Sequence, residues 1–335
     1  MTTPTHNKRG ALLALLAFAL YASHDAVVKY VGGYYSPVQV LFFGVLMGFP
    51  VITMTLLRDK TDGNLIPRHP WWTLIRTVAV VITGLCAFYA FSHLPLAQCF
   101  AIFFSTPLLI TLLAIPVLGE KVRLRRGLAV AVGLIGVMVV VRPGGDSDFN
   151  LGHLAAIVAA ITGSLASVIV RKVGHAERSA VLMLYPMVAN FIAMGLALPF
   201  VYRPMPIEHL GAFMTMAVLG SIGSFLIIGA YRKAEAMVVA PMQFSQIIWA
   251  TIYGYVFFDE RVDRATIIGA AIVIASGLYI LFREGKASVS ETTPVLQSKG
   301  RPEIATLPRP SLLMRLRNGS FPPPLPPAVP GQPGE

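Results

Sequence analysis

The chain has 335 residues and a mass of 36.1 kDa; 55% of its residues are hydrophobic and only 13% are charged. An ordinary soluble domain carries roughly 25% charged residues. The mean hydropathy here is +0.69. This composition excludes a disordered main body, nucleic-acid binding as the main role, and a disulfide-stapled secreted fold. The two cysteines, Cys86 and Cys99, fall in apolar runs, so we interpret them as buried thiols without a redox role.

Apolar runs of about 20 residues predict helices that cross a bilayer, whose hydrocarbon layer is roughly 30 Å thick. The first run could be a signal peptide because Lys8 and Arg9 precede it, but it is too long and continues past Asp25. We therefore predict an all-α integral membrane protein with ten transmembrane helices. The runs lie near residues 10–31, 36–57, 71–92, 95–117, 124–142, 151–170, 179–201, 209–230, 237–258 and 265–282.

The two ends of the chain differ from this body. Residues 1–9 form a short polar segment before the first span. Residues 288–335 are rich in proline and cannot bury a core, so we predict a disordered tail. Within the tail, residues 311–317 (SLLMRLR) could lie on lipid headgroups or simply belong to the disordered segment.

Positive charges are divided unequally between the two sets of loops. If the N-terminus is cytoplasmic, 12 Lys and Arg residues lie in cytoplasmic loops and four in outer loops. This bias follows the positive-inside rule, so both termini are expected in the cytoplasm. The net charge of +11 therefore indicates a membrane rather than nucleic acid as the partner. The outer four are Arg142, Arg203, Arg261 and Arg264.

The second half of the chain resembles the first when the sequence is shifted by about 140 residues. Each half, residues 10–142 and 151–283, holds five spans. Because five is odd, the second half must enter the membrane upside down. Inverted repeats are the build of secondary transporters, whose substrate site lies at the repeat interface. The alternative is chance similarity between apolar helices. Phe104-Ser105 falls on Phe244-Ser245, and Gly119-Glu120-Lys121-Val122 falls on Asp259-Glu260-Arg261-Val262; a shift of 142 lays Lys29-Tyr30-Val31-Gly32 on Arg171-Lys172-Val173-Gly174.

The repeated span ends also carry a family resemblance. Leu118-Gly119-Glu120 and Phe258-Asp259-Glu260 each precede a glycine-rich span. In these features, over residues 9–283, the chain resembles the EamA type of the drug/metabolite transporter (DMT) superfamily. The resemblance implies ten helices in two inverted five-helix repeats, with helices one, three, four, six, eight and nine around a central cavity. Residues 25–29, 37–43 and 105–120 resemble a bacterial subgroup that includes riboflavin and S-adenosylmethionine uptake proteins, which commonly have Arg where Gly44 stands here.

Three charged residues fall inside spans. Asp25 and Lys29 are four apart, share a helix face and can pair. They could form a polar wall of the transport path, with Asp25 or His24 taking a coupling proton, or a structural pair with Lys29 snorkelling to the headgroups. Arg76 could hold an anionic substrate group at the inner mouth, or snorkel beside the interfacial pair Trp71-Trp72.

Polar residues on the ninth and fourth spans are the candidate substrate contacts. Three recur every three residues on the ninth span and are expected near one face. The tryptophan among them lies in mid-span and could stack on a planar substrate, or only pack. The matching fourth span carries a further amide and further hydroxyl groups. The set comprises Gln243, Gln246 and Trp249 on the ninth span, and Gln98 and Ser105 on the fourth.

Two prolines and two glutamates have expected structural or gating roles. Pro107 and Pro241 lie inside the fourth and ninth spans, where proline bends a helix and frees a backbone carbonyl. Bent helices suit alternating access, although kinks without function are also common. Glu120 and Glu260 stand at span ends, where they could cap the helices and bind neighbouring loops, or gate the path.

The remaining functional classes find little support. The seven histidines form no metal-spaced cluster, and the chain has no HExxH, GxSxG or Walker A motif. We therefore expect no enzyme activity, cofactor or metal; a channel or a sensor is the alternative to a carrier. The prediction is a bacterial inner-membrane carrier for a small polar molecule, first a planar cofactor-like solute such as riboflavin. Export of amino acids or other metabolites, or S-adenosylmethionine uptake, is the alternative, and a homodimer is possible.

Overall fold

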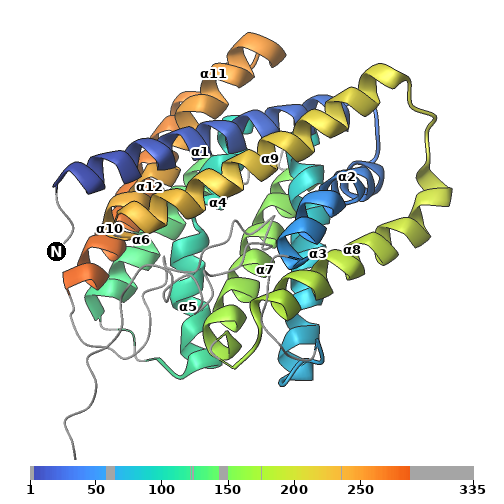
Figure 1. Cartoon of the computed structure of the whole chain (residues 1–335). Coiled ribbons are helices and arrows are strands. Elements are labelled where there is room, and N and C mark those ends of the chain that lie inside the picture. The colour runs from blue at the N-terminus through green and yellow to red at the C-terminus, as the bar shows by residue number, and fades with distance from the viewer. Residues whose placement is uncertain are drawn as a thin grey trace, which may run out of the picture.

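The computed structural model describes residues 4–57, 65–120, 122, 124–142, 150–174, 176–234 and 236–286. All regular structure in these residues is helical (Figure 1), which confirms the all-α prediction. The predicted disordered tail at 288–335, including residues 311–317, lies outside the described residues.

Ten spans can be followed along the described chain, two of them divided. The first three are α1 (Pro4–Gly32), α2 (Pro37–Leu57) and α3 (Pro70–His93). The fourth is divided into α4 (Leu96–Phe103) and α5 (Thr106–Leu118), and the fifth is α6 (Leu124–Val141). The next three are α7 (Leu151–Val173), α8 (Ser179–Val201) and α9 (Ile207–Lys233). The ninth comprises α10 (Ala236–Val239), the 3-10 helix η1 (Ala240–Ser245) and α11 (Gln246–Phe258); the tenth is α12 (Arg264–Lys286).

Length and composition suit these segments to a bilayer. Within the described residues, eight helical stretches are long and apolar enough to cross a membrane. The apolar part of α2 is shorter, Pro37–Pro50, and the ninth span is interrupted by η1. A helix rises about 1.5 Å per residue, so about 20 residues match a hydrocarbon layer of roughly 30 Å. The ten-helix prediction is confirmed.

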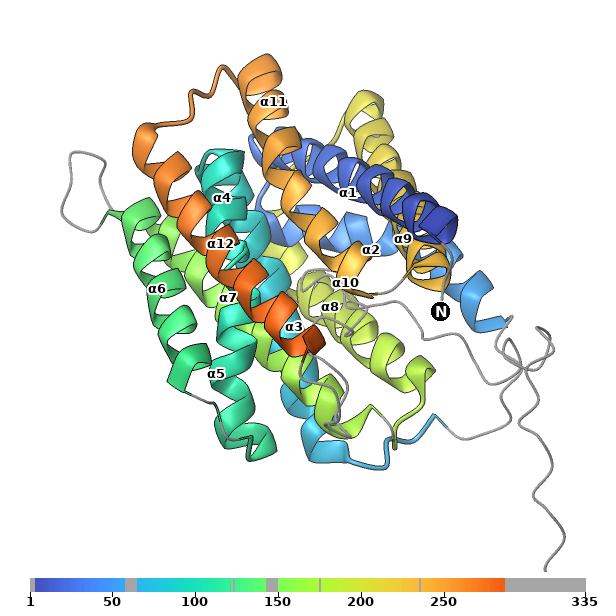
Figure 2. The same cartoon turned by 90° about the vertical axis from the view of Figure 1, so that its left-hand side faces the viewer.

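The helices pair in a pattern that the two halves share. Helix α1 packs along α9, and α3 packs along α7 (Figures 1 and 2). Helices α1 and α9 are the first and eighth spans, and α3 and α7 are the third and sixth. Exchanging the two halves of the chain therefore converts one pair into the other. The second and seventh spans (α2 and α8) and the fifth and tenth (α6 and α12) pair with their own counterparts. This reciprocal pairing is that of two inverted five-helix repeats. A hydrogen bond of 3.0 Å joins Tyr21 of α1 to Ser224 of α9.

The pair α6 and α12 is in backbone contact at two glycines. A Cβ added to Gly136 would lie 2.9 Å from the carbonyl oxygen of Gly269, and a Cβ on Gly269 would lie 2.6 Å from that of Gly136. Small residues at helix interfaces let backbones approach closely in membranes, where dispersion rather than hydrophobic burial holds helices together. Glycine at both positions therefore permits this close packing.

Both divided spans break at equivalent positions. The fourth span turns at Phe104-Ser105, and the ninth becomes a 3-10 helix that ends at Ser245. Pro107 stands in the first turn of α5, after the break in the fourth span, and Pro241 stands in the first turn of η1, the 3-10 helix of the ninth span. A proline there costs no helical hydrogen bond, because the first N–H groups of a helix have no partner within it.

Candidate functional site

The two helix breaks meet near the middle of the molecule. The rings of Phe104 and Phe244 lie edge to face, with centroids 5.0 Å apart. The hydroxyl of Ser105 donates to the carbonyl of Ile102 at 2.6 Å, and that of Ser245 donates to Met242 at 2.7 Å. Each serine thus satisfies a carbonyl three residues back, as expected where a helix tightens. The two breaks therefore share this serine contact.

The half-helices after the breaks begin with polar residues that are not fully satisfied. Gln246 is the first residue of α11, is only 7% exposed, and its Nε2 has no hydrogen-bond partner among the described residues. Thr106, its counterpart at a shift of 140, is the first residue of α5, and its buried Oγ1 also has no such partner. Both groups lie where a helix restarts within a span, the kind of position at which divided helices of transporters bind substrate.

The other candidates of the fourth and ninth spans surround these breaks. Trp249 is half-buried and lies near-parallel to Tyr253, with ring centroids 6.3 Å apart. The hydroxyl of Tyr253 is 2.8 Å from that of Ser23, which ties α11 to α1. Gln98 and Gln243 are half-buried. Since Gln243 belongs to η1 and Gln246 and Trp249 to α11, the predicted common face does not lie on one continuous α-helix.

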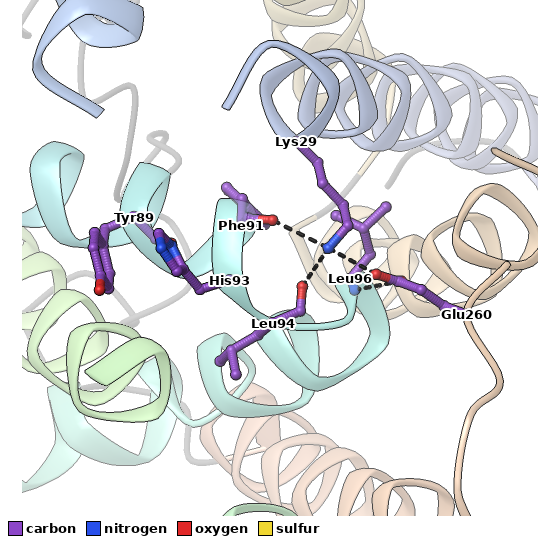
Figure 3. A network of polar contacts seen from close by, with 7 residues as sticks. All are labelled: Lys29, Tyr89, Phe91, His93, Leu94, Leu96 and Glu260. Atoms are coloured by element: carbon purple, nitrogen blue, oxygen red, sulfur yellow. Dashed lines mark hydrogen bonds and ion pairs between the residues drawn. The ribbon is translucent and has the colours of Figure 1, made fainter. Parts of the chain in front are cut away.

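A charged network closes one end of the bundle (Figure 3). The ammonium of Lys29 lies 2.7 Å from Oε1 of Glu260 and donates to the carbonyls of Leu94 at 2.5 Å and Phe91 at 3.3 Å. The backbone N–H of Leu96 donates to Oε2 of Glu260 at 3.0 Å. One ion pair therefore joins α1, α11 and the α3–α4 turn. The expected pairing of Lys29 with Asp25 is wrong, because a partner from the other repeat takes its place.

The same ion pair recurs at the other end. Nη2 of Arg171, at the end of α7, lies 2.5 Å from Oε1 of Glu120. Both glutamates follow a residue in the left-handed conformation, Gly119 (φ 72°) and Asp259 (φ 51°). Their backbone N–H groups donate six residues back to close the helix ends. Both glutamates thus pair across the repeats.

Asp25 and Arg76 are buried in other surroundings. Asp25 is 1% exposed, and its Oδ1 lies 2.8 Å from Nδ1 of His24. Arg76 is 2% exposed and donates to the carbonyl of Leu182 on α8 at 2.5 Å. Snorkelling of Arg76 is therefore wrong, because its guanidinium lies inside the bundle. It is Lys172 that lies by the interfacial tryptophans, 4.1 Å from the ring centre of Trp72.

Two features of this arrangement do not follow from the sequence patterns above. The pairing of Arg171 with Glu120 is one, although the shift of 142 places Lys29 on Arg171. The backbone groups of Leu94 and Leu96 carry no sequence signal for such a contact. Within the described residues, no group of three or more His, Cys, Asp and Glu side chains could hold a metal ion.

These features define a class: a multi-pass helical membrane protein of inverted repeats with discontinuous helices at the repeat interface, the architecture of secondary transporters. The EamA-like transporter family matches residues 8–142 and again residues 150–282. The chain belongs to this family, part of the drug/metabolite transporter superfamily, and is a membrane transporter of that type.

Named relatives share low identity over most of their length. An S-adenosylmethionine uptake transporter of Rickettsia prowazekii is 25% identical over 281 residues, covering 83% of this chain and 94% of the relative. The pseudopaline exporter CntI of Pseudomonas aeruginosa is 23% identical over 270 residues, covering 80% and 94%. A solved crystal structure matches with a TM-score of 0.56 at 18% identity, covering 85% of this chain and all of the other. That likeness supports the fold alone.

Proposed function

We propose that the chain is a secondary transporter that carries a small polar metabolite across a bacterial inner membrane by alternating access. Both termini are cytoplasmic in this proposal, as the loop charges predict. The Glu260 end of the bundle then faces the periplasm, and the Glu120 end faces the cytoplasm. The relatives named above are bacterial, which supports this membrane.

The observation that carries the proposal is the pair of matched helix breaks with unsatisfied polar groups. A buried amide without a partner costs about 1–3 kcal/mol, so its presence in mid-span needs a reason. The Nε2 of Gln246 at the start of α11 and the buried Oγ1 of Thr106 at the start of α5 are both without a hydrogen-bond partner among the described residues. A substrate carboxylate or other anionic group satisfies them.

Among the expected solutes, S-adenosylmethionine fits this arrangement and now takes precedence over riboflavin. Its carboxylate suits the Nε2 of Gln246 and the hydroxyl of Thr106, and its flat adenine suits the neighbouring Trp249. The relatives reported above are named for uptake of S-adenosylmethionine and export of pseudopaline. Export of amino acids or another metabolite is the second candidate, because one of these two relatives is an exporter.

Flux into proteoliposomes tests the proposal. The full chain is purified, reconstituted, and offered labelled S-adenosylmethionine, riboflavin or amino acids, with unlabelled solute inside to drive counterflow. Saturable counterflow of S-adenosylmethionine is the expected result. Counterflow of riboflavin or an amino acid alone would replace the substrate but keep the carrier. Unsaturable flow would indicate a channel, and the absence of flux for every solute would reject transport of these classes.

A further inference from the structure

The two ends of the bundle carry equivalent parts. A shift of 140 residues relates Leu94 to Ala234, Leu96 to Ala236 and Glu260 to Glu120, and a shift of 142 relates Lys29 to Arg171. The turns after α3 and α9 have the same shape: Leu94 has φ −118° and ψ 156°, and Ala234 has φ −135° and ψ 159°. Equivalent residues are therefore present at both ends, and the two ends can be compared by how these residues are arranged.

At the Glu260 end, the ion pair is docked on the α3–α4 turn. Lys29 and Glu260 together make three hydrogen bonds to its backbone, at Phe91, Leu94 and Leu96 (Figure 3). Lys29 and Glu260 side chains are only 11% and 15% exposed, so water competes weakly for these bonds. The helices at this end also pack against one another: α4 packs on α11, and α1 packs on α3.

At the Glu120 end, the ion pair is formed, but among the described residues it has no equivalent docking on a helix turn. Arg171 holds Glu120, yet its Nη1 is buried without a hydrogen-bond partner in the described part of the chain. Among the described residues, no packing comparable to α4 on α11 joins α5 to α10 or η1, and none comparable to α1 on α3 joins α7 to α9. Figure 2 shows α5 and α10 diverging away from the α4 and α11 end.

We infer that each ion pair is the fixed half of a latch and that the backbone of the adjacent helix turn is its releasable half. The Lys29–Glu260 pair holds the Leu94–Leu96 turn here; the Arg171–Glu120 pair takes the backbone groups of Ala234 and Ala236 in the opposite state. One latch closes as the other opens. The inference rests on the proposed function for its sidedness: the periplasmic end is closed in this structure, and the cytoplasmic end is open.

The latch requires particular chemistry at each position, which separates it from a simple ion pair. Residue 29 must donate to carbonyls, and residue 260 must accept from an N–H. Exchanging the charges, Lys29→Glu with Glu260→Lys, keeps the ion pair. It also makes a carboxylate, which only accepts, face the backbone carbonyls, and an ammonium, which only donates, face the N–H of Leu96. The exchange therefore restores a simple ion pair and leaves the latch open. Lys29→Arg keeps both charge and donors, and it should leave the latch closed.

Distances between spin labels measure the latch directly. In a chain with Cys86 and Cys99 replaced by alanine, one label pair at His93 and Phe257 reports the Glu260 end. A second pair at Ile115 and Lys233 reports the Glu120 end; all four side chains are exposed. The distances are measured without substrate. The charge exchange should shift the open-to-closed ratio at the Glu260 end by at least about tenfold, since hydrogen bonds to charged groups are lost. It should also shorten the distance at the other end.

Each outcome decides the inference. Wild-type distances in the charge-exchanged protein would overturn the latch in favour of a simple ion pair. If that variant is not monodisperse, Lys29→Met replaces it, and unchanged distances there would overturn the latch equally. Glu120→Gln is the matched control at the mirror position and should not open the Glu260 end; opening there would also overturn it. Because these distances need no substrate, a failed latch is distinguishable from a failed transport proposal, which shows as absence of flux in the wild type.

Discussion

Replacing Gln246 by leucine should make the protein more stable and less active at the same time. The side chain is 7% exposed, and its Nε2 has no partner among the described residues. Leucine has a similar size and no polar atoms. Removing an unpaired buried donor relieves a cost of about 1–3 kcal/mol, and the new apolar side chain suits its surroundings. If the same donor binds a substrate carboxylate, transport should fall about tenfold to a hundredfold, from a loss of about 1.5–3 kcal/mol.

Two measurements on each variant test whether stability rises while transport falls. Thermal unfolding in detergent, followed by intrinsic fluorescence, should give a higher Tm for Gln246→Leu at a matched scan rate, since unfolding of such proteins is often irreversible. Counterflow in proteoliposomes gives the transport rate. Thr251→Val is the control on the same helix: it is exposed, and its hydroxyl donates to the carbonyl of Ile247 one turn back. It should change neither value much. A lower Tm together with normal counterflow in Gln246→Leu would refute the reasoning.

Three further predictions concern packing and stacking. Trp249→Ala should abolish transport while the protein still inserts, with Trp249→Phe keeping part of the rate; normal counterflow by Trp249→Ala removes this ring from the site. Gly136→Ala places a Cβ 2.9 Å from a backbone oxygen and should lower stability by about 1–3 kcal/mol, read as Tm. Gly127→Ala has nothing within 4 Å and should be neutral or stabilising by up to about 1 kcal/mol; equal losses from both would contradict the packing account. Tyr21→Phe removes the bond to Ser224 and should cost about 1 kcal/mol, and an unchanged Tm would show that this bond adds nothing.

Hydropathy and repetition were enough to predict the architecture. In a bilayer the backbone polar groups must be hydrogen-bonded within the protein, and a helix does this within a single segment. A long apolar run is therefore predicted to be a helix. The match between Phe104-Ser105 and Phe244-Ser245 established the repeat, and both helix breaks lie at these residues, whereas bends were expected at Pro107 and Pro241. The glutamates at 120 and 260 were also recognised, although not their partners.

Partners across the fold could not be predicted from local spacing. Asp25 and Lys29 are one turn apart, which permits a pair, but a flexible lysine can reach several acceptors. The choice depends on tertiary packing, which brings Glu260 and two free carbonyls to the same place. Arg76 shows the same limit: its position suggested the headgroups, but α8 offers it the carbonyl of Leu182 inside the bundle.

The contact between Gly136 and Gly269 has a kinetic consequence. Helices α6 and α12 are counterparts in the two repeats, so inverting the molecule exchanges them and leaves their contact in place. This contact is then common to both access states. A bulkier residue there should slow the forward and return half-cycles by the same factor, whereas a change at Glu260 should favour one half-cycle over the other. The ratio of influx to efflux rates would thus distinguish a substitution at the Gly136–Gly269 contact from a substitution at Glu260.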